Sequence, residues 1–134
     1  RGLDGHSDAD VVLHAIADAI LGAAALGDIG THFPPSDERW RGADSRDLLR
    51  LSAGHVRDAG WLVVNIDVTV IAEAPKINPH VAAMRSELRR CLDLEVDAIS
   101  VKATTNEGMG FVGRGEGIAA IATAMIAPID RADE

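Results

Sequence analysis

The chain has 134 residues, of which 47% are hydrophobic and only 3% aromatic, so one compact domain with an aliphatic core is expected. Its formal net charge of −8 argues against non-specific binding to nucleic acids or anionic membranes, which needs a basic surface. The single cysteine excludes an internal disulfide framework, and no apolar run is long enough for a membrane span. These properties indicate one soluble, intracellular domain over residues 1–134, with a segment expected to be missing ahead of Arg1.

The first predicted element is a helix over Val11–Leu26. Ser7 is a suitable N-cap for it, and Gly27 suits the left-handed residue that ends a helix. Apolar residues surround most of the segment, so we expect this helix to be largely buried.

A line of polar residues at a spacing of four interrupts the apolar surface of this helix: Asp10, His14 and Asp18. Buried polar side chains need partners. One interpretation is that His14 hydrogen-bonds a neighbouring carboxylate inside the core. The other is that His14 binds a metal ion and that Asp10 or Asp18 orients its ring. A zinc site needs three or four ligands, so the helix alone favours the first interpretation.

The segment Thr31–Ala43 contains two consecutive prolines and is predicted to be a loop long enough to be functional. A second helix is predicted over Ser45–Ala59, with Asp44 as its cap and Gly60 as its stop. Its inner face is expected to consist of Leu48, Leu49, Ser52, Ala53 and Val56.

The clearest strand is Trp61–Ala72, because apolar and polar residues alternate along it. One side is predicted to carry Leu62, Val64, Ile66, Val68 and Val70, and the other Asn65, Asp67 and Thr69.

The second half of the chain mixes helix and strand. A third helix follows the cap at Asn78 and runs to about Asp93, and a short strand is predicted over Ile99–Ala103. Periodicity does not decide between strand and helix for the apolar run Ile118–Ile129. We therefore expect an α+β fold in which helices pack on one face of a sheet. The buried residues expected on the third helix are Val81, Met84, Leu88, Cys91 and Leu92.

Two clusters at the ends of the first helix are candidate binding sites. His6 and Ser7 lie at its start, where free backbone N–H groups favour an anion such as phosphate, although a plain cap is the simpler interpretation. Asp28 lies between Gly27 and Gly30 and could accept hydrogen bonds from paired sugar hydroxyls. An ordinary helix-ending turn explains this second cluster equally well.

A third candidate is Ala72–Asn78, directly after the clearest strand. A rigid proline turn can offer backbone groups to the edge of a base, with Lys76 close to a phosphate. A connecting turn with a solvated lysine is the simpler interpretation of this segment alone.

The fourth candidate is the glycine-rich segment Lys102–Gly117. Thr104 and Thr105 offer hydroxyls, Glu107 offers a hard oxygen ligand for Mg²⁺ or Mn²⁺, and Arg114 can bind a phosphate. The segment lacks the spacing of a nucleoside-triphosphate loop. So many phosphate-compatible groups in a short segment favour a function over a merely flexible loop.

Five signatures cover nearly the whole chain in one order: H-S-D-A-D-V-x-L-H-A, G-A-A-A-L-G-D-I-G-x-x-F-P, G-A-D-S-R, N-x-D-V-T-x-I-A-E-A-P-K and K-A-T-T-N-E-x-x-G-F-x-G-R-G-E-G-I-A. Together they resemble the 2-C-methyl-D-erythritol 2,4-cyclodiphosphate synthases of the non-mevalonate isoprenoid pathway. The resemblance implies a mixed sheet in which the last apolar run is a strand. It also implies a homotrimer with active sites between subunits, located in the bacterial cytoplasm or the plastid stroma.

The resemblance also implies roles for individual residues. His14 would be a zinc ligand together with residues upstream of Arg1, and Glu107 would bind a second divalent ion, Mg²⁺ or Mn²⁺, that bridges the diphosphate. His6 and Thr105 would be catalytic. Phe111 and Arg114 would line a cavity on the threefold axis that can hold an isoprenoid diphosphate. The implied substrate contacts are His6 and Ser7 for the methylerythritol phosphate end; Asp28, Ile29 and Gly30 for ribose; Phe33, Pro34, Pro35, Ser36 and Asp37 for methylerythritol; Ala72, Pro75, Lys76, Ile77 and Asn78 for cytosine and diphosphate; and Thr104, Thr105, Asn106 and Glu107 for the phosphates.

Two departures from the family pattern stand out. The family begins with a D-x-H pair that supplies the other two zinc ligands, and this sequence starts after that point. An incomplete N-terminus and a loss of activity are the two explanations. In addition, Pro35 stands where the family often has an aspartate, which alters how this loop meets the substrate hydroxyls.

The implied reaction joins the 2-phosphate of 4-diphosphocytidyl-2-C-methyl-D-erythritol 2-phosphate to its β-phosphorus by in-line attack and releases CMP. A phosphate monoester with a second pKa of about 6 is already mostly dianionic at neutral pH, so no strong base is needed. The site must instead hold two anions together and neutralise them, with help from metal ions. Two alternatives stay open: the cyclase half of a bifunctional cytidylyltransferase/cyclase chain, and a trimer that binds isoprenoid diphosphates without catalysis.

Overall fold

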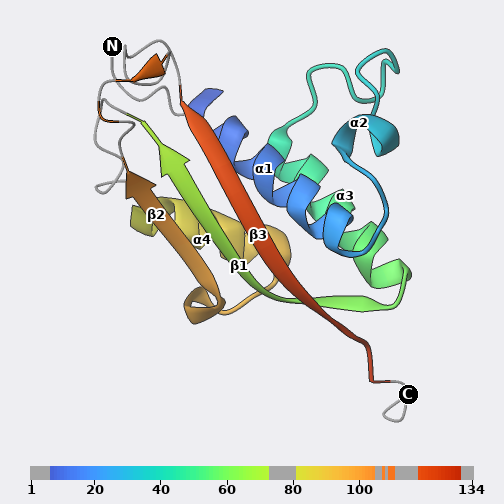
Figure 1. The fold of residues 1–134 in the computed structure, drawn as a ribbon. Helices are drawn as coiled ribbons and strands as arrows, with labels where there is room; N and C mark the ends of the chain where they lie inside the picture. Colours follow the sequence, from blue (N-terminus) through green and yellow to red (C-terminus); the bar gives the residue numbers. More distant parts are fainter. Residues whose placement is uncertain (1–6, 73–80, 105–106, 108, 111–117, 131–134) are drawn as a thin grey trace.

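The computed structural model describes residues 7–72, 81–104, 107, 109–110 and 118–130, and of residues 7 and 8 only the backbone. Figure 1 shows a small sheet with helices behind it. Within the described residues, no helix is long and apolar enough to cross a membrane. In chain order the elements are α1 (Ser7–Ala23), α2 (Ile29–His32), α3 (Ser45–Asp58), β1 (Trp61–Ile71), α4 (Val81–Leu92), the 3₁₀ turn η2 (Val96–Ala98), β2 (Ile99–Thr104) and β3 (Ala119–Pro128).

The described strands form a mixed sheet in the order β2-β1-β3. β1 pairs with β2 in parallel, from Ile66 opposite Ile99 to Ile71 opposite Thr104. β1 pairs with β3 in antiparallel fashion over nearly its whole length. The parallel pair needs a crossover, which α4 supplies. The apolar run that periodicity could not decide is therefore a strand, as the family resemblance implied.

The hydrophobic core lies between one face of this sheet and the helices α1, α3 and α4 (Figure 1). Its members are almost entirely aliphatic, and burial of each such side chain contributes roughly 1.5–3 kcal/mol. This arrangement confirms the predicted α+β fold with helices on one face. The most deeply buried large side chains include Ile16, Ile20 and Leu21 of α1, Leu49 and Val56 of α3, Ile66, Val68 and Val70 of β1, Leu88 of α4 and Ile99 of β2.

The pairing of β1 with β3 contains a β-bulge. Val63 lies opposite Ile126, and the next paired residue of β1, Asn65, lies opposite Met125. Val64 is thus an extra residue on β1. Because of this extra residue, the side chains of β1 that precede Val64 alternate in the opposite phase from those that follow it, so the other set faces the core.

The prediction that Leu62 and Val64 share the core face of β1 with Ile66 is therefore wrong. Leu62 and Val64 are exposed, whereas Trp61 and Val63 pack against the core. Strict alternation along the sequence holds only beyond the bulge, where every second residue from Ile66 is buried.

The predicted boundaries of α3 are confirmed. The carboxylate of Asp44 accepts a hydrogen bond from the backbone N–H of Arg46, and Gly60 has the left-handed φ of +97° just after the helix. Leu48, Leu49 and Val56 face the core, as predicted. The predicted start of α4 at Asn78 lies outside the described residues.

The end of α1 differs from the prediction. Ala25, not Gly27, is the left-handed residue that closes the helix, with a φ of +58°. The N–H of Leu26 donates to the carbonyl of Leu21 (2.9 Å), and that of Ala25 donates to Gly22 (3.0 Å). This is the double hydrogen bond of a Schellman motif. Gly27 also has a positive φ, +94°, but in the link to α2.

We predict that Ala25→Gly stabilises the protein by about 0.5–1 kcal/mol, because glycine removes the steric cost of the left-handed backbone. The measurement is the free energy of unfolding in urea. Ala19→Gly in the interior of α1 is the control, and it should destabilise the protein by about 1 kcal/mol. A loss of stability in Ala25→Gly would contradict the assignment of this cap.

Candidate active site

The polar line of α1 lies on the exposed side of the helix, not in the core. His14 and Asp18 are both exposed, while Asp10 is partly buried. The Nε2 atom of His14 is 3.0 Å from the hydroxyl of Ser45, the first residue of α3. Within the described residues, neither aspartate hydrogen-bonds the His14 ring. The rest of α1 is largely buried, as predicted, with Val12, Ile16 and Ile20 in the core. The predicted hydrogen bond between His14 and a neighbouring aspartate is not observed, because Ser45 takes that place.

His14 is suited to be one ligand of a metal ion. Ser45 occupies the hydrogen-bonding position at Nε2, so the lone pair for a metal would be that of Nδ1 when Nε2 carries the proton. No group of three or more His, Cys, Asp or Glu side chains gathers as a metal site within the described part of the chain. His14 fits a metal ion only together with ligands from elsewhere.

Ser45 is held beside His14 by the start of α3. Asp44 caps the helix, and Arg46 binds both Asp44 (2.7 Å) and Glu87 of α4 (2.9 Å). The hydrogen bonds from Arg46 lower the pKa of Asp44 to about 2. Ser45 itself is buried, so its hydroxyl has few positions available.

Asp28 caps a short helix that the sequence analysis did not predict. Its Oδ1 atom accepts hydrogen bonds from both the N–H and the hydroxyl of Thr31, each 2.8 Å long. These bonds lower the pKa of Asp28. Within the described residues, Oδ2 has no hydrogen-bond partner. The turn is therefore not a simple helix end, and it presents one ionised oxygen that could accept from a sugar hydroxyl.

The loop after α2 is anchored by an aromatic cluster. Phe33 is buried and meets Trp40 edge to face, with ring centroids 4.9 Å apart. The ring of His55 from α3 lies 5.8 Å from Phe33 and 4.7 Å from His32, whose Nε2–H donates to the carbonyl of Leu26 (2.7 Å). This cluster was not among the predicted features of the chain. A signal was present, because two of the four Phe and Trp residues lie in this short segment.

The other predicted residues of this loop surround Phe33. Pro34 is partly buried, and Pro35 and Ser36 are exposed. Asp37 forms an ion pair with Arg39 at 2.9 Å, and this contact lowers the pKa of Asp37. The carboxylate of Asp37 is therefore already engaged by a cation within its own loop.

The carboxyl ends of β1 and β2 meet at one edge of the sheet. The N–H of Ala72 donates to the carbonyl of Thr104 (3.0 Å), so the last described residue after β1 lies beside the end of β2. Glu107 is exposed, and Lys102 is paired with Asp67 on the open face of the sheet (2.9 Å). The predicted site residues that lie outside the described ones are His6, the side chain of Ser7, Pro75, Lys76, Ile77, Asn78, Thr105, Asn106, Phe111 and Arg114.

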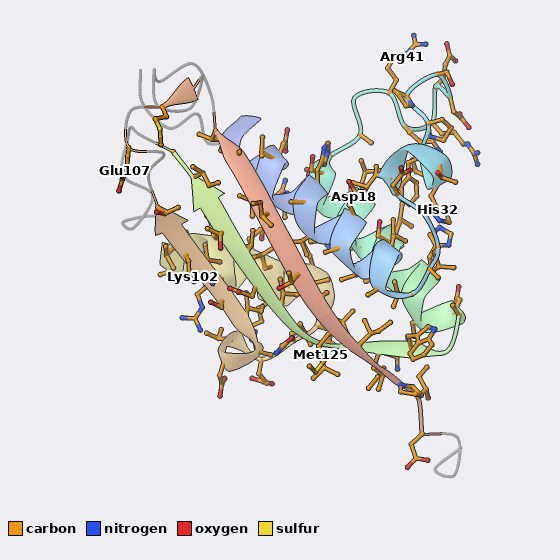
Figure 2. The ribbon with its side chains drawn as sticks, in the orientation of Figure 1. Asp18, His32, Arg41, Lys102, Glu107 and Met125 are labelled. Carbon is orange, nitrogen blue, oxygen red and sulfur yellow. The ribbon has the colours of Figure 1, made fainter. Side chains whose placement is uncertain are left out.

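The described site residues thus form two separate groups. Asp28 caps α2, and Asp18 of α1 is hydrogen-bonded to Ile29, the first residue of α2. In Figure 2, Asp18 lies beside α2, whereas Glu107 lies beyond the carboxyl ends of β1 and β2, away from α2. Within the described residues, the turn of α2 and Glu107 therefore lie apart (Figure 2).

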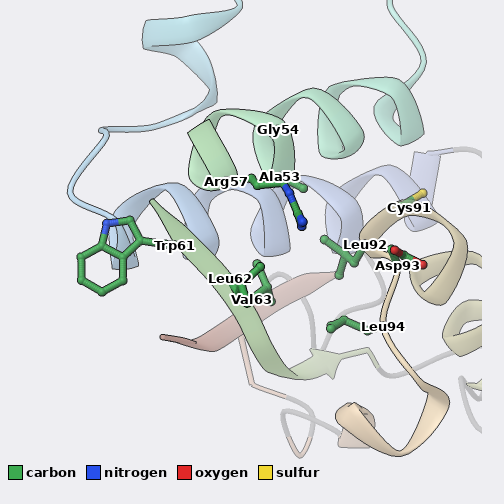
Figure 3. A pocket seen from close by; sticks show the side chains of 10 residues that line it. All are labelled: Ala53, Gly54, Arg57, Trp61, Leu62, Val63, Cys91, Leu92, Asp93 and Leu94. Atoms are coloured by element: carbon green, nitrogen blue, oxygen red, sulfur yellow. The ribbon is translucent and has the colours of Figure 1, made fainter. Parts of the chain in front are cut away.

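A pocket of about 220 Å³ lies elsewhere, between α3, the start of β1 and the end of α4 (Figure 3). Ala53, Arg57, Trp61 and Asp93 are among its lining residues. None of the predicted site residues lines this pocket, so it is not the candidate active site.

Residues 1–127 match the model of the YgbB family, and the chain belongs to that family. Its curated relatives include the 2-C-methyl-D-erythritol 2,4-cyclodiphosphate synthase of Symbiobacterium thermophilum, which is 62% identical over 95% of this chain and 81% of its own length. Another is the bifunctional enzyme IspD/IspF of Allorhizobium ampelinum, 60% identical over 94% of this chain but 31% of its own length.

Two solved structures show the same fold. The bifunctional IspDF of Campylobacter jejuni is 44% identical, with a TM-score of 0.87 over 96% of this chain and 35% of its own length. The IspF of Plasmodium falciparum, solved as a CDP complex, is 32% identical, with a TM-score of 0.80 over 96% of this chain and 76% of its own length. The family resemblance found in the five signatures is confirmed.

We predict that Asp44→Ala lowers the free energy of unfolding by about 1 kcal/mol, because the first turn of α3 loses its cap. The pKa of Asp44 is lowered from 3.8 to about 2 in the folded protein. The contribution of the ionised Asp44 carboxylate to the free energy of unfolding is therefore fully present above pH 3.8 and is lost as the pH falls toward about 2. Urea unfolding between pH 7 and 3 should show the difference from wild type shrinking in acid. Asp47→Ala, an exposed residue paired with Arg50 in the same helix, should show a smaller effect.

Proposed function

We propose that this chain is a 2-C-methyl-D-erythritol 2,4-cyclodiphosphate synthase, which forms the cyclic diphosphate from 4-diphosphocytidyl-2-C-methyl-D-erythritol 2-phosphate and releases CMP. The family match and the 62% identity to a synthase of that name support the activity. The observation that carries the proposal is that His14, exposed on α1, and the oriented carboxylate of Asp28, which caps α2, are both available for a ligand. We expect the enzyme to act in the cytoplasm or in plastids.

The nucleotide end of the substrate is assigned to the turn of α2. The Oδ2 atom of Asp28 would accept hydrogen bonds from the ribose hydroxyls, and Gly30 would allow the backbone to approach the sugar closely. The CDP complex of the Plasmodium falciparum relative supports a cytidine nucleotide as the ligand class.

The reaction forms one phosphorus–oxygen bond and breaks another. An oxygen of the 2-phosphate attacks the β-phosphorus in line with the bond to the α-phosphate, and CMP leaves with that bond's electron pair. A divalent ion held by His14 with further ligands, and a second one held by Glu107, would neutralise charge on the phosphates. The hydroxyls of Thr104 and Thr105, together with Lys76, would orient the diphosphate.

We propose a homotrimer whose active sites lie between subunits. The open face of the sheet carries exposed large apolar side chains, which are unusual on the surface of a soluble monomer: Leu62, Val64, Ile121 and Met125. Contact between subunits through this face would cover them. The separation of Asp18 from Glu107 within one chain also supports a site shared by neighbouring chains (Figure 2). An isoprenoid diphosphate in an axial cavity remains part of this proposal.

A bifunctional parent chain is the second candidate. The relative from Allorhizobium ampelinum is a bifunctional enzyme, and this chain matches 31% of its length. The cyclase reaction assigned to this chain is the same in either arrangement.

The proposed activity is tested by adding the cytidine diphosphate substrate and measuring CMP release and the cyclic product by ³¹P NMR. We predict that Thr105→Ala lowers turnover at least tenfold with little change in unfolding temperature, because a group that orients the diphosphate is lost. Absence of CMP release by the wild-type protein would contradict the proposed function. Wild-type turnover in Thr105→Ala would contradict only the role of this threonine.

We further predict that His14→Ala abolishes zinc retention by the full-length polypeptide, because a ligand is lost. Zinc content is measured by mass spectrometry after dialysis. His55→Ala, which removes a histidine of the aromatic cluster, should retain the metal. Undiminished zinc in His14→Ala would show that His14 is not a ligand.

A further inference from the structure

The carboxylate of Asp18 connects α1 to the turn that carries Asp28. Its Oδ1 atom accepts a hydrogen bond of 2.8 Å from the backbone N–H of Ile29, which is eleven residues away in the sequence. Ile29 is the first residue of α2, so its N–H has no acceptor within its own helix. Asp18 lies on the side of α1 that faces α2 (Figure 2).

The four-residue helix α2 depends on contacts from outside itself. Isolated helices of this length are not stable in water. Its backbone bonds are Phe33 to Ile29 (2.7 Å) and a longer one from His32 to Asp28 (3.4 Å). Asp28 caps α2, and the ring of His32 donates a hydrogen bond to the carbonyl of Leu26. The carboxylate of Asp18 forms the hydrogen bond that joins α2 to the middle of α1.

These contacts fix the direction of the Asp28 carboxylate. Both hydrogen bonds from Thr31 end on Oδ1, so the orientation of the carboxylate is fixed relative to α2, and Oδ2 is the oxygen left for a ligand. The bond from Ile29 to Asp18 joins α2 directly to α1, beside the packing of Ile29 against the core and the bond from His32 to Leu26. Displacement of α2 would therefore move Oδ2 away from a bound sugar.

We propose that Asp18 is a positioning residue for nucleoside recognition, which holds the Asp28 carboxylate at the place where it receives the ribose hydroxyls. This inference rests on the proposed function of Asp28. Asp18 acts as a hydrogen-bond acceptor for one N–H and not through its charge or through His14. Asparagine, whose Oδ1 can accept the same bond, should therefore replace it.

The test compares the binding of CDP by calorimetry in wild type, Asp18→Ala and Asp18→Asn, all in a buffer with Mg²⁺. We predict that Asp18→Ala weakens CDP binding roughly tenfold, as expected for the loss of one well-placed hydrogen bond. Asp18→Asn should bind CDP within about twofold of wild type. Asp47→Ala, an exposed carboxylate paired within α3, is the control and should bind as wild type does.

A second ligand separates positioning from general damage. 2′,3′-Dideoxycytidine diphosphate lacks the hydroxyls that Asp28 would bind, so the wild type should bind it more weakly than CDP. Asp18→Ala should bind this analogue as the wild type does. Equal weakening of both ligands, wild-type affinity for CDP in Asp18→Ala, or failure of Asp18→Asn to restore binding would each overturn the positioning role.

The same series distinguishes this inference from the proposed function. If Asp28→Ala binds CDP as the wild type does, or the wild type does not prefer CDP to the dideoxy analogue, the ribose role of Asp28 fails and the inference about Asp18 fails with it. If Asp28→Ala loses that preference while Asp18→Ala keeps it, only the inference about Asp18 is overturned.

Discussion

The rotation of α1 about its own axis is the constraint on which the candidate site depends. Val12, Ile16 and Ile20 are at most 2% exposed and lie one turn apart, so they fix one side of the helix against the sheet and α3. His14 and Asp18 are two residues away from members of that row and therefore face away from it. The packing of the aliphatic row against the core therefore determines the direction in which His14 and Asp18 point. No further interaction is needed to place these two polar side chains at the surface.

Contacts with backbone N–H groups and arginine side chains then determine the orientation of the carboxylates on this surface and which of their oxygens a ligand can reach. Asp18 and Asp28 accept backbone N–H groups, Asp37 and Asp44 bind arginines, and each is directed by its partner. In a chain with a net charge of −8, unpartnered carboxylates would repel an anionic ligand. Lys102 already forms an ion pair with Asp67. The phosphates of the proposed substrate would therefore be neutralised by cations other than Lys102.

The sequence predicted elements whose signals are local. The limits of α3 followed from Asp44 and Gly60, and the strands followed from alternation or from the family signatures. Three features escaped because their causes are not local. The bulge at Val64 is set by pairing with β3, α2 is held by Asp18 from another helix, and Ala25 adopts a backbone that favours glycine because Leu26 beyond it packs against the core. Several candidate residues, such as Asp28 and Glu107, were predicted from local residue patterns, and the resemblance supplied the rest together with the individual roles. Their partners, such as Ser45 for His14, required the tertiary structure.

The mixed sheet places the described candidate residues in two separate regions, and this separation underlies the proposed site between chains. Because β1 and β2 are parallel, their carboxyl ends lie at the same end of the sheet, and the hydrogen bond between Ala72 and Thr104 joins them. The turn that carries Asp28 instead follows α1 at the opposite end of the helix layer, since α1 is a rigid rod of 17 residues. A substrate that joins a nucleoside to two phosphates needs both groups at once. Under the proposal of a shared site, a neighbouring chain supplies the phosphate-binding residues that the turn of α2 lacks. The exposed apolar side chains of β1 and β3 then form the surface through which the two chains contact each other.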